Sequence, residues 1–352
     1  MRSLKIFFSI LLLPLLACSQ FALPASVTTE PVAATESVPT EETLEATQPP
    51  QATEPPVEQP AEELRFGKAA RAHITAITEG IGARWSGTKE EAQTAEYIRQ
   101  TFVSLGYEPQ IQSFRMQGWA DDETEAMFDS ENVMAVKQGD SAQVVVIGAH
   151  YDSVEAGLGA DDNASGVGIL LELAALLKDV PAPYTIHFVA FGAEEAGLLG
   201  SQAYVEEMSG DVIGMINLDS VIAGDITYVY CNESEPALRD WAMDWAGKNE
   251  FNLQTIPNVD LTDGEGGGTA DFFAFQKAGI PFAYFESTNW TLGDQDGYTQ
   301  VDPQYGDGGA IIHTQYDTLE YLDETFPGRV DERLNGIVTI LYNLLAQYNA
   351  DN

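Results

Sequence analysis

The most constraining feature of this 352-residue chain is an apolar run that leads directly into polar residues. The run "QVVVIGAH", at 143–150, is apolar at successive positions and not only at alternate ones. Strands of that kind are usually buried on both faces, in the middle of a parallel sheet. A helical pattern, "GVGILLELAALLK" at 166–178, follows it. This order predicts a strand and helix unit of an α/β fold.

The same alternation of strand and helix spacing continues along the chain. Further strands are predicted at 108–114, 132–137, 185–191, 212–220 and 280–286, and helices at 88–106, 200–208, 235–249, 270–279 and 332–348. The predicted fold class is therefore α/β, with a mostly parallel mixed sheet sandwiched by helices. Residues 287–312 are rich in Gly, Asp and Gln and lack periodicity, which predicts a long loop; whether it binds calcium is left open.

The N-terminus has the pattern of an export signal. Arg2 and Lys5 precede an apolar segment that is too short to span a bilayer as a helix. The segment ends in "LLAC", which resembles the lipobox of bacterial lipoproteins, whose cysteine is lipidated. Residues 1–18 are thus interpreted as a lipoprotein signal peptide. Cys18 is the lipidated residue, so the chain is expected to be exported to the cell envelope and attached to a membrane through this lipid anchor only.

Residues 19–64 differ in composition from the rest of the chain. They contain eight prolines and nine glutamates but no Lys or Arg, which is typical of a disordered stalk. The remaining segment, 65–352, is predicted to be one catalytic domain. The formal net charge of −39 excludes nucleic acid as a partner, because like charges would repel.

Residues with metal-binding side chains follow several of the predicted strands. Because ligands of open α/β sheets gather at the carboxyl ends of the strands, these residues are expected to meet at one edge. Each one alone has an ordinary structural explanation, such as a helix cap or a turn. Together, two imidazoles and several carboxylates suit zinc in a site left open for water. The residues are His150, Asp152, Asp161, Asp162, Glu194, Glu195, Asp219 and His313.

The order of these motifs, "HYD", "GADDNASG", "EE", "NLD" and "IHT", resembles the di-zinc exopeptidases of metallopeptidase family 28, typified by secreted bacterial aminopeptidases. The resemblance begins at 65 and implies the zinc exopeptidase fold, similar to that of phosphorylases and hydrolases. It also implies two zinc ions per chain, with one residue bridging both and two further ligands for each. The implied roles are Asp162 as the bridge, His150 and Asp219 on one zinc, and Glu195 and His313 on the other.

The resemblance assigns two further carboxylates near the metals. Glu194 is the implied general base, which takes the proton of the metal-bound water and later delivers it to the leaving amine. Asp152 is the implied carboxylate that fixes the tautomer of a ligand imidazole. Asp162 is preferred over Asp161 as the bridge because it stands directly before Asn163. We expect Glu194 and Glu195 to lie in an extended stretch, where adjacent side chains point in opposite directions.

The implied activity is that of an exported, membrane-anchored aminopeptidase, which removes N-terminal residues from peptide substrates. Two alternatives share the fold, a glutaminyl cyclase and a carboxypeptidase, and a non-catalytic binding domain is a third. One departure from the family pattern is "ADF" at 270–272, where many members have Ser-Asp-His, which indicates altered substrate binding. The preferred N-terminal side chain and the oligomeric state are left open.

Overall fold

The structure is a computed structural model that describes residues 66–121, 123–208, 210–232, 234–256, 270–293 and 297–347. All of them belong to one compact unit, Ala61–Asn352. The predicted signal peptide with Cys18 and the predicted stalk lie outside the described residues. In the part of the chain that is described, none of the helices combines the length and apolar character required to cross a membrane.

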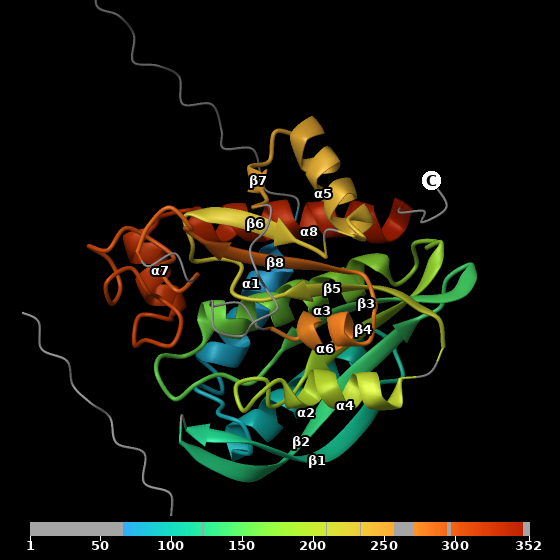
Figure 1. Cartoon of the computed structure of the whole chain (residues 1–352), viewed down its shortest axis with the longest axis horizontal. Coiled ribbons are helices and arrows are strands. Elements are labelled where there is room, and N and C mark those ends of the chain that lie inside the picture. Colours follow the sequence, from blue (N-terminus) through green and yellow to red (C-terminus); the bar gives the residue numbers. More distant parts are fainter. Residues whose placement is uncertain are drawn as a thin grey trace, which may run out of the picture. The chain divides into compact units, whose positions relative to one another are not determined.

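A single eight-stranded sheet forms the centre of the unit (Figure 1). The strand order is β1-β2-β4-β3-β5-β8-β6-β7, and β4, β3, β5 and β8 pair in parallel at the middle. The strands are β1 (Gln110–Asp121), β2 (Thr124–Lys137), β3 (Ser141–His150), β4 (Tyr184–Phe191), β5 (Val212–Leu218), β6 (Ile226–Tyr230), β7 (Leu253–Gln254) and β8 (Phe282–Thr288). This architecture confirms the predicted fold class, a mostly parallel mixed sheet with helices.

Helices pack on both faces of the sheet (Figure 1). A large apolar core lies between one face and α1, α2, α3, α5 and α8, and a second core with many aromatic rings lies between the other face and α4 and α6. The helices are α1 (Lys68–Thr78), α2 (Lys89–Ser104), α3 (Ser165–Leu177), α4 (Leu199–Glu207), α5 (Ala237–Lys248), α6 (Phe272–Lys277), α7 (Leu319–Thr325) and α8 (Arg329–Gln347). The side chain of Thr88 accepts a hydrogen bond from the backbone N–H of Glu91 and so caps the start of α2.

The structure differs from the sequence-based prediction at the edges of the sheet. β1 and β2 are longer than predicted and form an antiparallel hairpin, whose residues alternate in exposure along β1. Strands β6 and β7 and helix α7 were not predicted at all. β7 has only two residues and β6 five, so each is too short to establish a periodic pattern.

The register of the parallel strands β3, β4 and β5 places their carboxyl ends, which lead into polar residues, next to one another. His150, the last residue of β3, pairs with Phe191 at the end of β4, and Gly148 of β3 pairs with Asn217 of β5. The chain leaves all three strands at the same edge, so the residues that follow them are brought together there.

Candidate metal centre

Each candidate ligand lies at this carboxyl edge of the sheet. His150 ends β3, Glu194 and Glu195 follow β4, and Asp219 follows β5. Asp162 lies in η1 (Ala160–Ala164), an irregular helical turn that leads into α3. His313 comes from the long loop after β8. The structure therefore brings all of the predicted ligands to one site.

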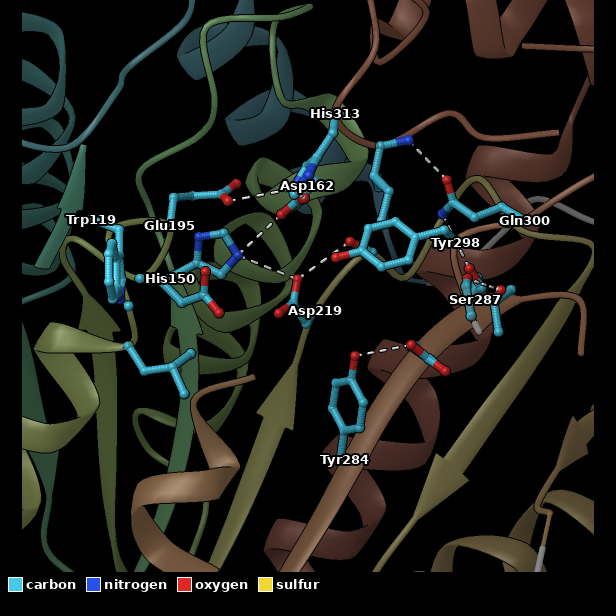
Figure 2. A pocket seen from close by; sticks show the side chains of 18 residues that line it. Trp119, His150, Asp162, Glu195, Asp219, Tyr284, Ser287, Tyr298, Gln300 and His313 are labelled. Atoms are coloured by element: carbon cyan, nitrogen blue, oxygen red, sulfur yellow. Dashed lines mark hydrogen bonds and ion pairs between the residues drawn. The ribbon is translucent and has the colours of Figure 1, made fainter. Parts of the chain in front are cut away.

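Asp162 lies between the two imidazoles (Figure 2). One of its carboxylate oxygens, Oδ1, is 3.1 Å from Nε2 of His150, and the other, Oδ2, is 3.0 Å from Nε2 of His313. Asp219 Oδ1 lies 3.3 Å from the His150 Nε2, and Glu195 Oε2 lies 3.3 Å from the His313 Nε2. The five side chains thus form two adjacent groups that share Asp162.

The donor set fits divalent cations. In the described chain, ligand atoms of His150, Asp162 and Glu195 lie within 4.8 Å of one another, and so do those of His150, Glu194 and Asp219. Oε1 of Glu195 is buried and has no hydrogen-bond partner, which is costly unless a cation is bound. Imidazole nitrogen and carboxylate oxygen are ligands that zinc binds readily. The side chain of His313 is 38% exposed, so water and substrate can reach the centre from that side.

The electrostatics of the cluster favour bound positive charge. Although burial alone would lower it, hydrogen bonds to Asp162 and Glu195 raise the pKa of His313 to about 12. Burial would raise the pKa of Asp162, but the hydrogen bonds with His150 and His313 hold it below its ordinary value. The negative carboxylates that stabilise the protonated form of the two imidazoles would also attract metal ions.

Asp161 has different contacts from its neighbour. Its Oδ1 accepts hydrogen bonds from the backbone N–H groups of Ile222 and Ala223, at 2.8 and 3.1 Å, and its Oδ2 accepts one from Gln300 Nε2 at 2.7 Å. The residue is completely buried. Asp162, whose oxygens face the histidines, is thus the better placed of the two to bridge metals.

The two glutamates lie in a tight turn and not in an extended stretch, so that expectation is wrong. The carbonyl oxygen of Glu194 accepts hydrogen bonds from the N–H groups of Gly197 and Leu198, and Ala193 has a φ of 52°. The turn belongs to the segment that connects β4 to α4. The two side chains still reach different partners: Glu195 contacts His313, and Glu194 lies near His150 and Asp219.

Asp152 connects this turn to the histidine. Its Oδ1 is 3.4 Å from Nδ1 of His150, and its two oxygens accept hydrogen bonds from the backbone N–H groups of Glu194 and Glu195 at 3.0 and 3.2 Å. Ser86 Oγ also donates to it, at 2.6 Å. This buried carboxylate therefore holds the turn that carries both glutamates, and it lies beside the imidazole of His150. The resemblance implied only the contact with an imidazole.

Two residues that position the centre were missed by sequence reasoning. Asp317 is buried and accepts hydrogen bonds from the backbone N–H groups of Asp161 and Asp162, at 2.6 and 3.1 Å. Gln300 accepts from the N–H groups of Ile311 and Ile312 through Oε1 and donates to Asp161 through Nε2. Asp317 stands four residues after His313, a spacing that could have drawn attention to it; Gln300 gives no local signal.

The centre opens into a pocket of about 310 Å³. Its other walls come from the β1 end, the turn before α4, β8 and the long loop, and include Trp119, Leu198, Tyr284, Glu286 and Tyr298. The ring of Tyr298 meets that of His313 edge-on, with centroids 6.0 Å apart. Among the described residues that line the pocket, none is Lys or Arg.

Comparison with known sequences supports this interpretation. The chain matches the model of Peptidase family M28 over residues 132–338. It is 32% identical to the Alkaline phosphatase isozyme conversion protein of Escherichia coli, covering 80% of this chain and 90% of that protein. It is 32% identical to Aminopeptidase YwaD of Bacillus subtilis over 55% of this chain, a match that spans only 41% of that relative.

Known structures share the fold. A zinc aminopeptidase from Bacillus subtilis superposes with a TM-score of 0.64 and 20% identity, over 82% of this chain and 98% of that one. A glutaminyl cyclase from Porphyromonas gingivalis gives a TM-score of 0.60 and 23% identity, over 80% and 98%. The predicted enzyme class, a metallo-exopeptidase, is confirmed at the level of the family. By the family match and the coverage of its relatives, the chain belongs to Peptidase family M28.

Proposed function

We propose that this protein is an aminopeptidase that binds two zinc ions and removes N-terminal residues from peptides. The observation that carries the proposal is the position of Asp162, whose two oxygens each face a different imidazole. His150 and Asp219 would complete one zinc site, and Glu195 and His313 the other. Bound there, zinc would polarise the scissile carbonyl and lower the pKa of water.

The protein's own side chains supply the proton transfer. Glu194 lines the pocket, and its carboxylate lies within 4.8 Å of ligand atoms of His150 and Asp219. Because the two proposed zinc sites take their ligands from five other residues, we assign Glu194 the role of base. Burial, with the charges of Glu195 and Asp219 adding to it, raises the pKa of Glu194 well above its ordinary value. A carboxylate beside the proposed zinc sites suits a general base, which removes a proton from the attacking water and gives it to the leaving amine. Asp152 fixes the turn on which this base is carried.

The direction of cleavage follows from the charges of the pocket. A substrate's α-ammonium group is attracted by the carboxylates, whereas a C-terminal carboxylate would require a cationic partner. We therefore expect a C-amidated peptide to be shortened from its N-terminus and an N-acetylated peptide of the same sequence to resist. Mass spectrometry of both digests measures this. The opposite pattern would make the protein a carboxypeptidase.

The other members of the fold are less well supported. Glutaminyl cyclases resemble the chain in fold alone, because their sequence identity is below 25%. A binding domain without catalysis has no need for five converging ligands and a sixth carboxylate at Glu194. The aminopeptidase proposal accounts for all six residues.

We further propose that the protein is a lipoprotein of the cell envelope, attached through Cys18. The support is the signal-like segment 1–18 with its "LLAC" ending, followed by the Pro- and Glu-rich segment 19–64. One relative, a Probable lipoprotein aminopeptidase LpqL of Mycobacterium tuberculosis, is 31% identical over 57% of this chain. Its name describes the combination of anchor and activity that we propose here.

Replacing the cysteine tests the anchor. Cys18→Ser should move the protein from the membrane fraction to the soluble fraction or leave it unprocessed, because acylation at this residue would be lost. Fractionation followed by immunoblotting measures the distribution. Cys231→Ser, which removes the chain's other cysteine, serves as the control and should stay with the membrane. Membrane association that is unchanged in Cys18→Ser would contradict the proposed anchor.

A further inference from the structure

The pocket contains one carboxylate that the metal centre does not use. Glu286 lies on β8 and lines the pocket, but it is not among the groups of described residues that could hold a metal ion. It is only 8% exposed. Burying a carboxylate without a partner of opposite charge costs free energy. The groups around Glu286 therefore indicate what kind of ligand it could bind.

Two tyrosines hold the Glu286 carboxylate in one orientation. The hydroxyl of Tyr230 donates to Oε1 at 2.6 Å, and that of Tyr284 donates to Oε2 at 2.9 Å. Trp290 Nε1 donates to the Tyr230 hydroxyl at 2.6 Å, so the proton of that hydroxyl is directed to Glu286. Figure 2 shows Tyr284 on the same side of the pocket as Asp219, away from His313. Each carboxylate oxygen keeps a lone pair for a further donor.

No lysine or arginine side chain faces Glu286 from the pocket, because neither residue type is among the described residues that line it. Burial raises the pKa of Glu286 to about 7, although the hydrogen bonds from Tyr230 and Tyr284 lower it. A ligand cation would relieve the cost of this burial.

The hydroxyl groups next to Glu286 on β8 already donate hydrogen bonds to backbone carbonyls. The hydroxyl of Ser287 donates to the carbonyl of Val221 at 2.7 Å, and that of Thr288 donates to the carbonyl of Gly297. If two zinc ions and a hydroxide balance the charges of the three ligand carboxylates, Glu286 and the base Glu194 are the pocket carboxylates left without a counter-charge. Glu286 is thus the pocket's remaining acceptor for a positive group.

We propose that Glu286 makes the enzyme selective for N-terminal residues with a long cationic side chain, arginine or lysine. This inference rests on the proposed aminopeptidase function and adds its substrate class. The α-ammonium group would stay at the metal centre, near Glu194, while the side chain extends along β8.

Pairs of substrates that differ only in charge test the proposal. The full-length zinc-loaded protein is assayed with p-nitroanilides of arginine and citrulline, which have the same shape, and of lysine and norleucine. A hydrogen bond to a charged group contributes enough to make kcat/KM about 10- to 100-fold higher for arginine than for citrulline. Equal values for arginine and citrulline in the unmodified protein would overturn the proposal without any variant.

A variant then locates the selectivity. Glu286→Gln keeps an acceptor oxygen for one of the two tyrosine hydroxyls and removes the charge, so the ratio of arginine to citrulline should fall toward one while the zinc content stays the same. Glu206→Gln, on the exposed part of α4, is the matched control and should keep the ratio of the unmodified protein.

The remaining outcomes separate the two proposals. If Glu286→Gln lowers kcat/KM equally for all four substrates, Glu286 binds the α-ammonium group or supports the fold, and the selectivity proposal is wrong. If the unmodified protein hydrolyses leucine or citrulline derivatives but not arginine, the peptidase function stands and the selectivity fails. Hydrolysis of none of these substrates, nor of free peptides, would refute both.

Discussion

Glu194→Gln should retain the bound metal and lose about 10²- to 10⁴-fold in turnover, the usual contribution of a general base. The glutamine amide has nearly the shape of the carboxylate but cannot accept the proton of the attacking water. The side chain lies near His150 and Asp219 in the pocket, so its loss acts at the reacting atoms. Steady-state kinetics and elemental analysis of the same sample measure both quantities.

The adjacent glutamate supplies the matched comparison. Glu195→Ala should lose metal as well as activity, because Glu195 Oε2 faces His313 and its Oε1 is buried with no partner. Since both residues lie in one turn, damage to the fold would affect the two variants alike. Equal loss of metal in Glu194→Gln and Glu195→Ala would show that the roles of base and ligand are wrongly assigned.

The candidate ligands could be predicted from the sequence because of the parallel sheet. Apolar strands such as 143–150 are recognisable by their pattern, and in a parallel sheet the residues that follow such strands meet at one edge. The structure does bring His150, Asp219 and Glu195 together there, with His313 arriving from the long loop. Their roles as ligands remain a prediction that metal analysis must test.

The residues that hold this arrangement could not be predicted in the same way. Asp152 accepts from the turn at Glu194, 42 residues away, and Gln300 reaches Asp161 across 139 residues. Such hydrogen bonds depend on how loops pack in three dimensions, and no sequence period encodes them. The turn at Glu194 was also misjudged, since a glutamate pair after a strand does not reveal the left-handed conformation of Ala193.

Glu286 illustrates the same limit. Its sequence context, "FAYFES", indicates a buried strand, in which a glutamate is unexpected. Only the structure shows that Tyr230 and Tyr284 hold the carboxylate at the wall of the pocket. The proposed substrate class therefore depends on tertiary packing, whereas the candidate metal ligands are recognisable in local motifs.

The central claim is a pair of zinc ions that share Asp162, and the most direct measurement is the zinc content of the purified protein. After reconstitution with zinc and dialysis, elemental analysis should give close to two zinc ions per chain, because each oxygen of Asp162 faces a separate imidazole. Removal by a chelator should abolish peptidase activity, and added zinc should restore it. A reconstituted protein that holds no zinc, or that cleaves peptides equally well after complete chelation, would contradict the account.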